Sequence, residues 1–365
     1  MDFAPSEEQQ DLAGLTARIL SDQVTNERLR EIEALDDRFD QRLWKQLAES
    51  DVLGAALPAP EGGGFGLLEQ CGVLVELGRT VAPVPYLSSI TAGAAILAEF
   101  GTAEHRRRWV APAARGEVVL TAALTEDPGT DPGTPVTRAD RDGADWVLTG
   151  AKTNVPAMAL ADLILVPAAT ERGTRVFLVE PGTTGLRAQR QEIVDSDSEG
   201  SLELTAVRVP DSEALPAGAF EALLQRATIG VCAHQVGVLS AALERTSDYA
   251  GQRVQFGRPI GGFQAVAQRL ADGFIDVEAA RLTMWQAAWT AAEGLPCTTE
   301  VATAKFWAAE AGHRVAHTAV HVHGGVGIDL DHELHRYFVA AKRGEFALGG
   351  ATTQLRRIGA RLAAK

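Results

Sequence analysis

An arginine followed by a stretch rich in glycine and proline is the segment of this chain best suited to bind a phosphate group. The stretch runs from Arg253 to Gln264 and reads R-x-x-F-G-x-P-I-x-x-F-Q, with Phe256 near its centre. It lies between two long segments of helical periodicity, so its glycines predict a turn whose backbone comes close to a surface. The guanidinium offers a planar set of donors, and the N–H groups that open the next helix have no partner within it. Taken alone, the stretch also fits a helix–helix connection with an arginine on the surface.

Histidines near the carboxyl end form a second candidate site. Six of the eight histidines fall between His313 and His335. His313, His317 and His321 are four residues apart, which places them on one face of a helix at a spacing that can bind a transition metal. On residue types alone, a metal site therefore stays open.

The composition is that of a folded, acidic globular protein. Its 365 residues, 46% hydrophobic and 22% charged, suffice for two or three domains. The net charge of −14 argues against a nucleic-acid partner, because phosphates require a basic face. Cys71, Cys232 and Cys297 are scattered and odd in number, which predicts neither a disulfide framework nor a zinc site. No signal peptide and no apolar run near the roughly 18 residues of a membrane helix are evident, so we expect a cytoplasmic protein without a membrane partner.

The apolar periodicity changes twice along the chain and predicts three domains with an α+β fold. Residues 1–117 have helical spacing and begin with a capping box of Ser6 and Gln9. Residues 118–212 alternate short apolar runs with turns, which indicates a small β-barrel or sandwich, and residues 213–365 are helical again. No G-x-G-x-x-G follows a strand, so a Rossmann unit is not expected. The expected strands are residues 118–124, 146–150, 163–166, 176–179 and 202–209.

These segments together resemble the acyl-CoA dehydrogenase family. The stretch from Arg253 to Gln264 closely resembles the family signature, and V-H-V-H-G-G-V-G resembles its Q-x-x-G-G-x-G motif, with His321 where the family usually has glutamine. The glycine-rich break from Pro58 to Gly66 and V-E-L-G-R in the first domain match as well, so the resemblance covers nearly the whole chain. It implies a helical N-terminal domain, a small β-barrel middle domain and a C-terminal four-helix bundle.

The resemblance implies FAD as the cofactor, an acyl-CoA thioester as the substrate and a tetramer, of like or unlike chains, as the assembly. In that family the two motifs reach across a subunit interface to the FAD of the neighbouring chain. The family also implies an electron-transfer flavoprotein as the electron acceptor, and it uses no metal, so we expect none at the histidines. The residues placed at the cofactor by the two motifs are Arg253, Phe256, Gln264, His321, Gly324 and Gly325.

The family's catalytic base has no counterpart at the matching positions. Desaturation between Cα and Cβ needs a base for the α-proton, and the family supplies a glutamate near the carboxyl end or on the helix before the signature. The first position falls on Gly350, or on Leu348 when the alignment starts upstream, and the second falls on Ala227. Glu345 is the nearest acid that could substitute, although a solvated carboxylate at a helix end fits it better.

The loops that face the flavin in the family are also altered. T-E-D-P-G-T-D resembles the family's T-E-P-x-x-G-S-D, so Thr125 could bond the flavin pyrimidine and Thr130 could replace the usual serine. Asn154 stands where the family has an aromatic residue that covers the flavin. Pro156 stands where it has a hydroxyl residue that bonds flavin N5, and proline has no donor.

Three hypotheses follow from this pattern. The elements that the chain would lend to a neighbour's FAD are kept, while those for its own flavin are eroded, so the chain resembles the subunit without a base in actinobacterial two-chain acyl-CoA dehydrogenases. Alternatively, the chain is a self-sufficient homotetrameric enzyme with a displaced base, Glu345 first. In the third hypothesis it is a scaffold or binding protein that kept the fold and lost the flavin.

Overall fold

The computed structural model describes residues 5–127, 130–195 and 197–363. The chain divides into two compact units. The helical unit comprises the residues up to Asn26, Cys71–Ala82 and the residues from Thr228 onward. The sheet unit comprises Glu27–Gln70 and Pro83–Ala227. The predicted division into three domains stays a prediction.

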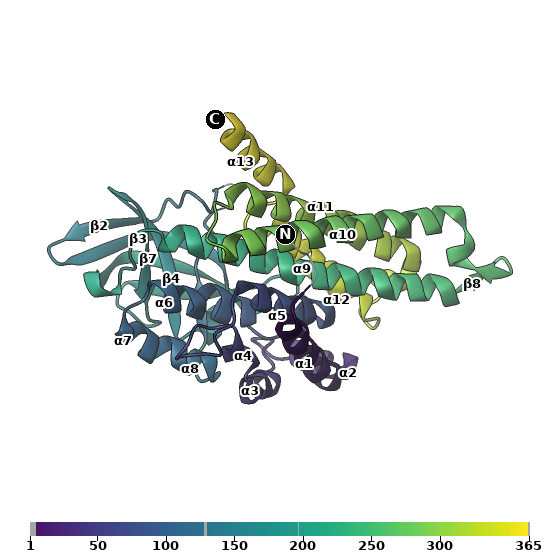
Figure 1. Cartoon of the computed structure of the whole chain (residues 1–365), viewed down its shortest axis with the longest axis horizontal. Coiled ribbons are helices and arrows are strands. Elements are labelled where there is room, and N and C mark those ends of the chain that lie inside the picture. Colours follow the sequence, from purple (N-terminus) through teal and green to yellow (C-terminus); the bar gives the residue numbers. More distant parts are fainter. Residues whose placement is uncertain (1–4, 128–129, 196, 364–365) are drawn as a thin grey trace. The chain divides into compact units, whose positions relative to one another are not determined.

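The sheet unit is built on one mixed sheet of seven strands within its described residues (Figure 1). The strands run in the order β1-β4-β2-β3-β7-β6, with β5 also paired to β4. β1 and β2 pair with β4 in parallel, and the other pairs are antiparallel. The strands are β1 (Leu120–Ala122), β2 (Arg138–Asp142), β3 (Asp145–Pro156), β4 (Leu163–Thr170), β5 (Gly173–Val179), β6 (Leu186–Gln191) and β7 (Glu199–Pro210).

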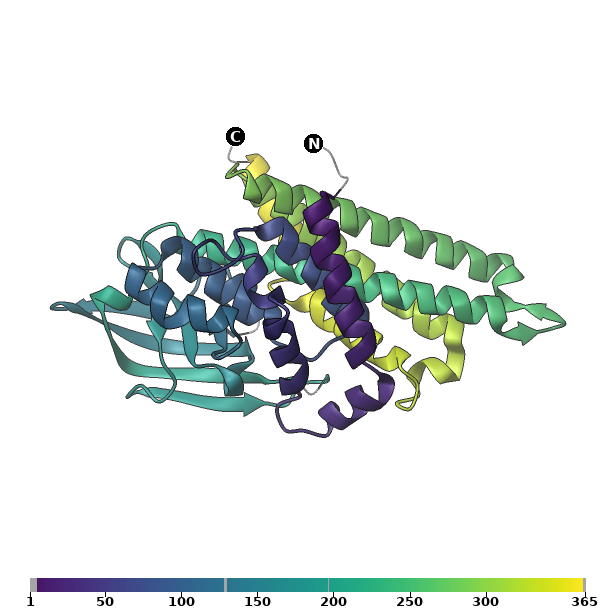
Figure 2. The ribbon, with the colours of Figure 1, turned by 60° about the horizontal axis from the view of Figure 1, so that its bottom comes forward.

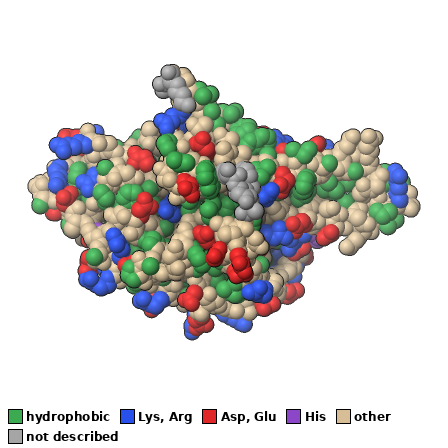
Figure 3. All heavy atoms as spheres, viewed as in Figure 1, with side chains coloured by type: hydrophobic (Ala, Val, Ile, Leu, Met, Phe, Trp, Pro, Cys, Tyr) green, Lys and Arg blue, Asp and Glu red, His purple; other side chains and the backbone are tan. Residues whose placement is uncertain are grey.

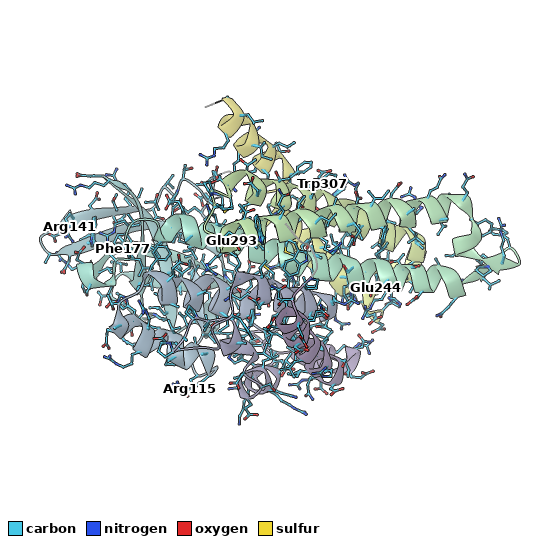
Figure 4. All side chains as sticks on the ribbon, in the orientation of Figure 1. Arg115, Arg141, Phe177, Glu244, Glu293 and Trp307 are labelled. Carbon is cyan, nitrogen blue, oxygen red and sulfur yellow. The ribbon has the colours of Figure 1, made fainter. Side chains whose placement is uncertain are left out.

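The five predicted strands are present, and β2 and β6 were missed. Buried apolar side chains such as Ile164, Phe177 and Leu202 form the sheet core. Phe177 contacts the ring of Trp146 edge to face, with ring centroids 5.5 Å apart, whereas Arg141 lies on the exposed β2–β3 hairpin (Figure 4). β2 and β6 consist mainly of exposed polar residues, so no apolar pattern marks them in the sequence.

A buried π-helix lies against the first strand of the sheet. η1 (Leu87–Ala94) presents Ser89, whose hydroxyl accepts a hydrogen bond from the N–H of Leu120 at 3.1 Å. A Cβ added to Gly93 would lie 2.6 Å from the Cβ of Leu120, so only glycine permits this approach. The other helices of this unit are α3 (Gln41–Glu49), α4 (Val52–Ala55), α6 (Ala95–Phe100), α7 (Ala103–His105), η2 (Arg106–Val110) and α8 (Ala111–Ala114), and α2 (Asn26–Glu33) begins at the unit boundary.

Long helices form the helical unit, and its α9 and α10 run side by side in both ribbon views (Figures 1 and 2). α5 and α9 come into backbone contact at a glycine pair. A Cβ on Gly78 would lie 2.1 Å from the carbonyl of His234, and one on Gly237 would lie 2.0 Å from that of Val75. Glycine therefore allows the two helices to pack closely at this contact. The helices are α1 (Glu7–Gln23), α5 (Leu67–Thr80), α9 (Ala219–Gln252), α10 (Gln264–Ala292), α11 (Thr298–His323), α12 (Leu334–Phe346) and α13 (Ala351–Ala363).

Two local predictions for the helices are confirmed. Ser6 and Gln9 form both hydrogen bonds of a capping box at the start of α1. α10 begins at Gln264, the last residue of the signature stretch. Among the described residues, α9 alone has the length and apolar content of a membrane span, which was not expected from the sequence. Of its 18-residue apolar stretch, 72% is buried inside the chain.

A charged pair is buried inside the sheet unit. The ammonium of Lys152 donates to a carboxylate oxygen of Glu126 at 2.7 Å, and the two side chains are 0% and 2% exposed. The backbone N–H groups of Val136 and Thr137 donate to the same carboxylate at 2.6 and 3.0 Å. Burial pushes the pKa of Glu126 upward, but the hydrogen bonds from Lys152 and Thr137 outweigh it, so the pKa lies below its usual value.

We expect the substitution Glu126→Gln to lower the free energy of unfolding by about 3–5 kcal/mol, because it leaves the buried ammonium of Lys152 without a counter-charge. Urea unfolding followed by tryptophan fluorescence measures this change. Asp140→Asn is the control, since it breaks the exposed Arg138–Asp140 pair, which should cost less than about 1 kcal/mol. An equal decrease in the free energy of unfolding for both variants would show that the buried pair stabilises the fold no more than the exposed pair.

Candidate functional site

The predicted phosphate-binding stretch forms a short hairpin that joins α9 to α10. The backbone N–H of Arg253 donates to the carbonyl of Tyr249 at 2.8 Å, and the carbonyl of Arg253 accepts from Ile260 at 2.8 Å. The hairpin therefore continues the helix pair directly, and it lies at the far end of these two helices (Figure 2). Its antiparallel strands are β8 (Val254–Gln255) and β9 (Arg258–Pro259).

The turn of this hairpin holds a phenylalanine in a conformation that L-residues rarely adopt. Phe256 and Gly257 have φ angles of 53° and 79°. Asparagine and glycine are the preferred residues of such two-residue turns. Phe256 is also 92% exposed. Backbone strain and an exposed aromatic ring both raise the free energy of the isolated chain, which points to a second molecule that contacts the ring.

The other side chains of the hairpin either brace it or point outward. The rings of Phe263 and Phe256 meet edge to face at 6.1 Å, and the guanidinium of Arg258 lies 4.2 Å from the ring of Phe263. Arg253 and Gln264 are exposed. Arginine and hydrophobic atoms are visible at this end in the space-filling view (Figure 3). The structure thus brings Arg253, Phe256 and Gln264 together on one exposed hairpin and helix start.

The second predicted motif is exposed as well. His321 lies on the last turn of α11, and Gly324 opens the 3₁₀-helix η6 (Gly324–Ile328) with a φ of 64°. A Cβ added to Gly324 or Gly325 would meet no atom within 4 Å, so the backbone at both glycines is open to a ligand. The exposed side chains of Ile328 and Leu330 follow. We call the hairpin with Gln264 and the segment from His321 to Gly325 the two arms of the clasp.

Sequence reasoning missed a buried histidine inside the second arm. His323 is 5% exposed, and its ring is stacked on Tyr249 at a centroid distance of 4.3 Å and an interplanar angle of 19°. The four-residue histidine spacing drew attention to His313, His317 and His321 instead. Only the alternation V-H-V-H, which puts His323 on a different helix face from His321, signals a different environment.

The predicted flavin-facing threonines lie in one loop of the sheet unit. The carbonyl of Thr125 accepts a hydrogen bond from the N–H of Thr153 at 3.0 Å, and the N–H of Thr130 donates to the carbonyl of Asp127 at 3.0 Å. Thr125 directly precedes Glu126, so the buried pair with Lys152 anchors this loop to β3. Both threonines are partly exposed.

The neighbouring positions on β3 are bonded within the chain. Asn154, with a φ of 49°, donates its N–H to the side chain of Gln191 at 2.7 Å and its amide to Glu199 at 3.1 Å. The carbonyl of Pro156 accepts the hydroxyl of Thr121. Asn154 therefore joins a polar network, and Pro156 supplies no donor, where the family places an aromatic residue and a hydroxyl.

The positions of the family's base carry no carboxyl group. Ala227 is buried in α9. Leu348, with a φ of 55°, and Gly350 belong to the connection between α12 and α13. The side-chain amide of Gln354 donates to the carbonyls of Leu348 at 3.2 Å and Gly349 at 2.9 Å, which fixes this connection. Only ordinary contacts of 3.6 and 3.9 Å await a Cβ at Gly350, so packing alone does not forbid a side chain there.

Glu345, the substitute base, is engaged in an ion pair. Its carboxylate accepts from the ammonium of Lys342 at 2.5 Å and lies 3.5 Å from Nδ1 of His313. The side chain is 13% exposed, so the interpretation as a solvated carboxylate is wrong. The carboxylate is thus already occupied by Lys342 and His313, which argues against Glu345 as the base.

A buried lysine fixes the end of α12, close to the same connection. The ammonium of Lys305 donates to the carbonyl of Glu345 at 3.1 Å, and its side chain is fully buried beside Cys232. A cation at the carboxyl end of a helix is favourable, because it meets unpaired carbonyls. Burial nevertheless lowers the pKa of Lys305 to about 8 and raises that of Cys232 to about 12.

The histidine row does not assemble a metal site in the described part of the chain. No group of three or more histidine, cysteine or acidic side chains there could hold an ion. The rings of His313 and His317 are 4.5 Å apart, as the spacing predicts, but Lys342 contacts His313 at 3.2 Å. Burial and the neighbouring His313 and Lys342 lower the pKa of His317.

Comparisons with known proteins identify the class of this fold and site. The N-terminal domain of acyl-CoA dehydrogenases matches residues 6–117, and their C-terminal domain matches residues 218–363. The chain is 48% identical to acyl-CoA dehydrogenase FadE27 of Mycobacterium tuberculosis, over 100% of this chain and 99% of that protein. The chain belongs to the acyl-CoA dehydrogenase family.

Two solved structures of paired proteins are particularly similar. A chain of the ChsE4–ChsE5 complex from Mycobacterium tuberculosis is 48% identical with a TM-score of 0.96, and the match covers 100% of both chains. A chain of the steroid acyl-CoA dehydrogenase Tcur3481–Tcur3483, in a G363A variant, is 41% identical with a TM-score of 0.94, over 98% and 99% of the two chains. The predicted α+β fold with helical outer domains is thereby confirmed.

FAD is the cofactor of this family, and one related structure, a glutaryl-CoA dehydrogenase from Mycobacterium smegmatis, was solved with FADH₂. The clasp suits the dinucleotide part of such a molecule, because Arg253 and the backbone at Gly325 offer phosphate donors and the two glycines leave space for the phosphate. The β3 positions suit the ring system less well, since Asn154 and Pro156 offer it neither an aromatic cover nor a hydroxyl.

We expect Phe256→Asn to stabilise the isolated chain by about 0.5–1 kcal/mol, because asparagine tolerates a positive φ that strains phenylalanine. The same change removes the exposed ring and should weaken association with any molecule that contacts it. Thermal unfolding of the chain alone measures the first effect. Leu35→Asn is the control, since it removes another exposed hydrophobic side chain at a residue without positive φ. A lower melting temperature for Phe256→Asn would contradict the strain argument.

Lys305 should make stability depend on pH in a defined window. Its pKa is about 8 in the folded chain, against 10.5 for a lysine fully exposed to water, so between these values the unfolded chain binds more protons. The contribution of Lys305 to the free energy of unfolding should therefore rise with pH across this window, by at most about 1.4 kcal/mol per pH unit.

In Lys305→Met the free energy of unfolding should rise less steeply with pH than in the unmodified chain, because methionine does not titrate. Urea unfolding at several pH values between 8 and 10 compares the variant with the unmodified chain. Lys45→Met, at an exposed lysine of α3, should leave the slope unchanged. Parallel pH curves for the Lys305 variant and the unmodified chain would refute the assignment.

Proposed function

We propose that this chain is a subunit of an FAD-dependent acyl-CoA dehydrogenase that completes the FAD site of an unlike, homologous chain carrying the catalytic base. The observation that carries the proposal is a contrast within one molecule. The clasp residues are present and exposed, whereas the base positions lack a carboxyl group and Asn154 is bonded internally. A chain that served its own flavin would need the second set of residues as well.

The clasp would act by binding and orientation alone. Arg253 would hold phosphate oxygens with its planar donors, and the N–H of Gly325 would meet the same charge. Gly324, whose own N–H donates to the carbonyl of Val320, would let the phosphate approach the backbone closely. Phe256 and Gln264 would contact the remaining dinucleotide, and His321 would give one hydrogen bond in place of glutamine. FAD, when bound, supplies the two-electron oxidation, and the α-proton would leave to the partner's base.

The similarity to chains of paired proteins supports an assembly of unlike subunits, and it favours a hetero-tetramer over a homotetramer. The steroid acyl-CoA dehydrogenase among them makes CoA thioesters of steroid side chains the first substrates to test, ahead of fatty acyl-CoA. An electron-transfer flavoprotein as acceptor and a cytoplasmic location belong to the same proposal.

The direct test is to purify the chain alone and together with a co-expressed homologue that has glutamate at the family's base position. A colourless chain alone, and a yellow complex that bleaches with acyl-CoA, are expected. A yellow chain that bleaches by itself would instead support a self-sufficient enzyme. Absence of colour in both preparations would support a scaffold without flavin.

Within the complex, Arg253→Ala should weaken FAD binding by roughly ten- to a hundredfold, the range expected for a lost charge-assisted hydrogen bond to phosphate. Equilibrium dialysis with FAD measures the change. The FAD affinity of Arg253→Lys should lie between those of Arg253→Ala and the unmodified complex, because lysine keeps the charge but not the planar donor set. Arg18→Ala, at an exposed arginine of α1, is the control. Unchanged FAD affinity in Arg253→Ala would overturn the proposed function.

A further inference from the structure

The two arms of the clasp come from different helices, so something must hold them in a fixed relation. The hairpin follows the end of α9, and the segment from His321 to Gly325 closes α11. Phosphate recognition tolerates little relative motion of its donors, because a displacement of about 1 Å is enough to break a hydrogen bond. The two helix ends therefore need a direct contact.

The stacked rings of Tyr249 and His323 provide that contact. Their centroids are 4.3 Å apart at 19°, which is a closer and more parallel arrangement than the edge-on contacts of the hairpin phenylalanines. Tyr249 lies one turn before Arg253, and its carbonyl accepts the Arg253 N–H at 2.8 Å. His323 directly precedes Gly324, whose N–H donates to the carbonyl of Val320. Each ring is thus attached to one arm by a short, hydrogen-bonded piece of backbone.

The hydrogen bonds around His323 fix the orientation of its ring. Nδ1 of His323 lies 2.9 Å from the carbonyl of Ala319, and because a carbonyl only accepts, this nitrogen carries the proton. The ring of His332 lies 5.5 Å away, and the N–H of Leu334 donates to its Nδ1 at 3.2 Å. The imidazole of His323 is therefore held on one side by its own helix and on the other by the tyrosine ring.

We propose that His323 is a positioning residue that, by stacking on Tyr249, fixes the hairpin arm and the glycine arm of the clasp in the geometry required for FAD. This inference rests on the proposed function. His323 would then contribute measurably to FAD affinity although its side chain need not touch the cofactor. A histidine that merely fills the core would contribute to folding but not to FAD binding.

The test uses the complex with the flavin-bearing partner and the variants His323→Phe, His323→Leu, Tyr249→Leu and the double Leu variant. Phenylalanine keeps a flat ring, so His323→Phe should bind FAD within about twofold of the unmodified complex. Each single Leu variant should bind FAD roughly two- to tenfold more weakly, the range expected from loss of an aromatic pair. The double variant should be no worse than the weaker single variant, because both remove the same contact.

Val315→Ala is the matched control for folding, since Val315 is a buried residue of α11 away from the stack. It should lower the melting temperature and leave the FAD dissociation constant unchanged at a temperature where the protein is folded. Unchanged FAD affinity in His323→Leu, or additive losses in the double variant, would overturn the inference. If Arg253→Ala weakens FAD binding while the stack variants do not, only this inference fails. If Arg253→Ala has no effect, the proposed function fails with it.

Discussion

Under the proposed function, recognition of phosphate by the exposed clasp is the constraint on which the rest of this structure depends. Donors that serve another molecule cannot be satisfied within their own fold, so the Arg253 side chain and the backbone at Gly325 stay exposed. The strained, exposed turn at Phe256 has the same origin, because a hairpin optimised for the isolated chain would place asparagine there. The stability lost at these positions must come from elsewhere in the fold.

The helical unit supplies that stability and the rigidity that the clasp needs. The glycine contacts between α5 and α9 bring the backbones together, and the Gly273 position of α10 lies close to Leu243 of α9. Long helices packed at this distance move as one body, so the hairpin at their end is held away from the core without becoming loose. Burial of the Lys305 charge lowers the stability of the fold. Its hydrogen bond to the carbonyl of Glu345, however, fixes the end of α12.

The sequence predicted the parts of the molecule that follow from period and motif, and it missed those that follow from tertiary contact. Helix starts such as Gln264 and strands such as β4 carry local signals, whereas β2 and β6 are polar and exposed and leave none. The exposed clasp residues could be proposed from the sequence because their residue types and spacing form motifs along the chain. His323 and Lys305 were not, because one gains its role from a tyrosine 74 positions away and the other from a carbonyl 40 positions away. The environment of Glu345 was also missed, because its contacts with Lys342 and His313 cannot be inferred from the adjacent residues in the sequence.

The distribution of kept and altered residues makes sense if each part of the chain is judged by the molecule that it contacts. Positions that would face this chain's own flavin are free to change once a partner performs the chemistry, and Asn154 has been absorbed into hydrogen bonds with Gln191 and Glu199. Positions that would face the partner's cofactor remain under the geometric demands of phosphate binding. A general loss of function would alter the positions facing the chain's own flavin and those facing the partner's cofactor alike. A self-sufficient enzyme would keep both sets of positions. The asymmetry therefore favours division of labour between unlike chains over either alternative.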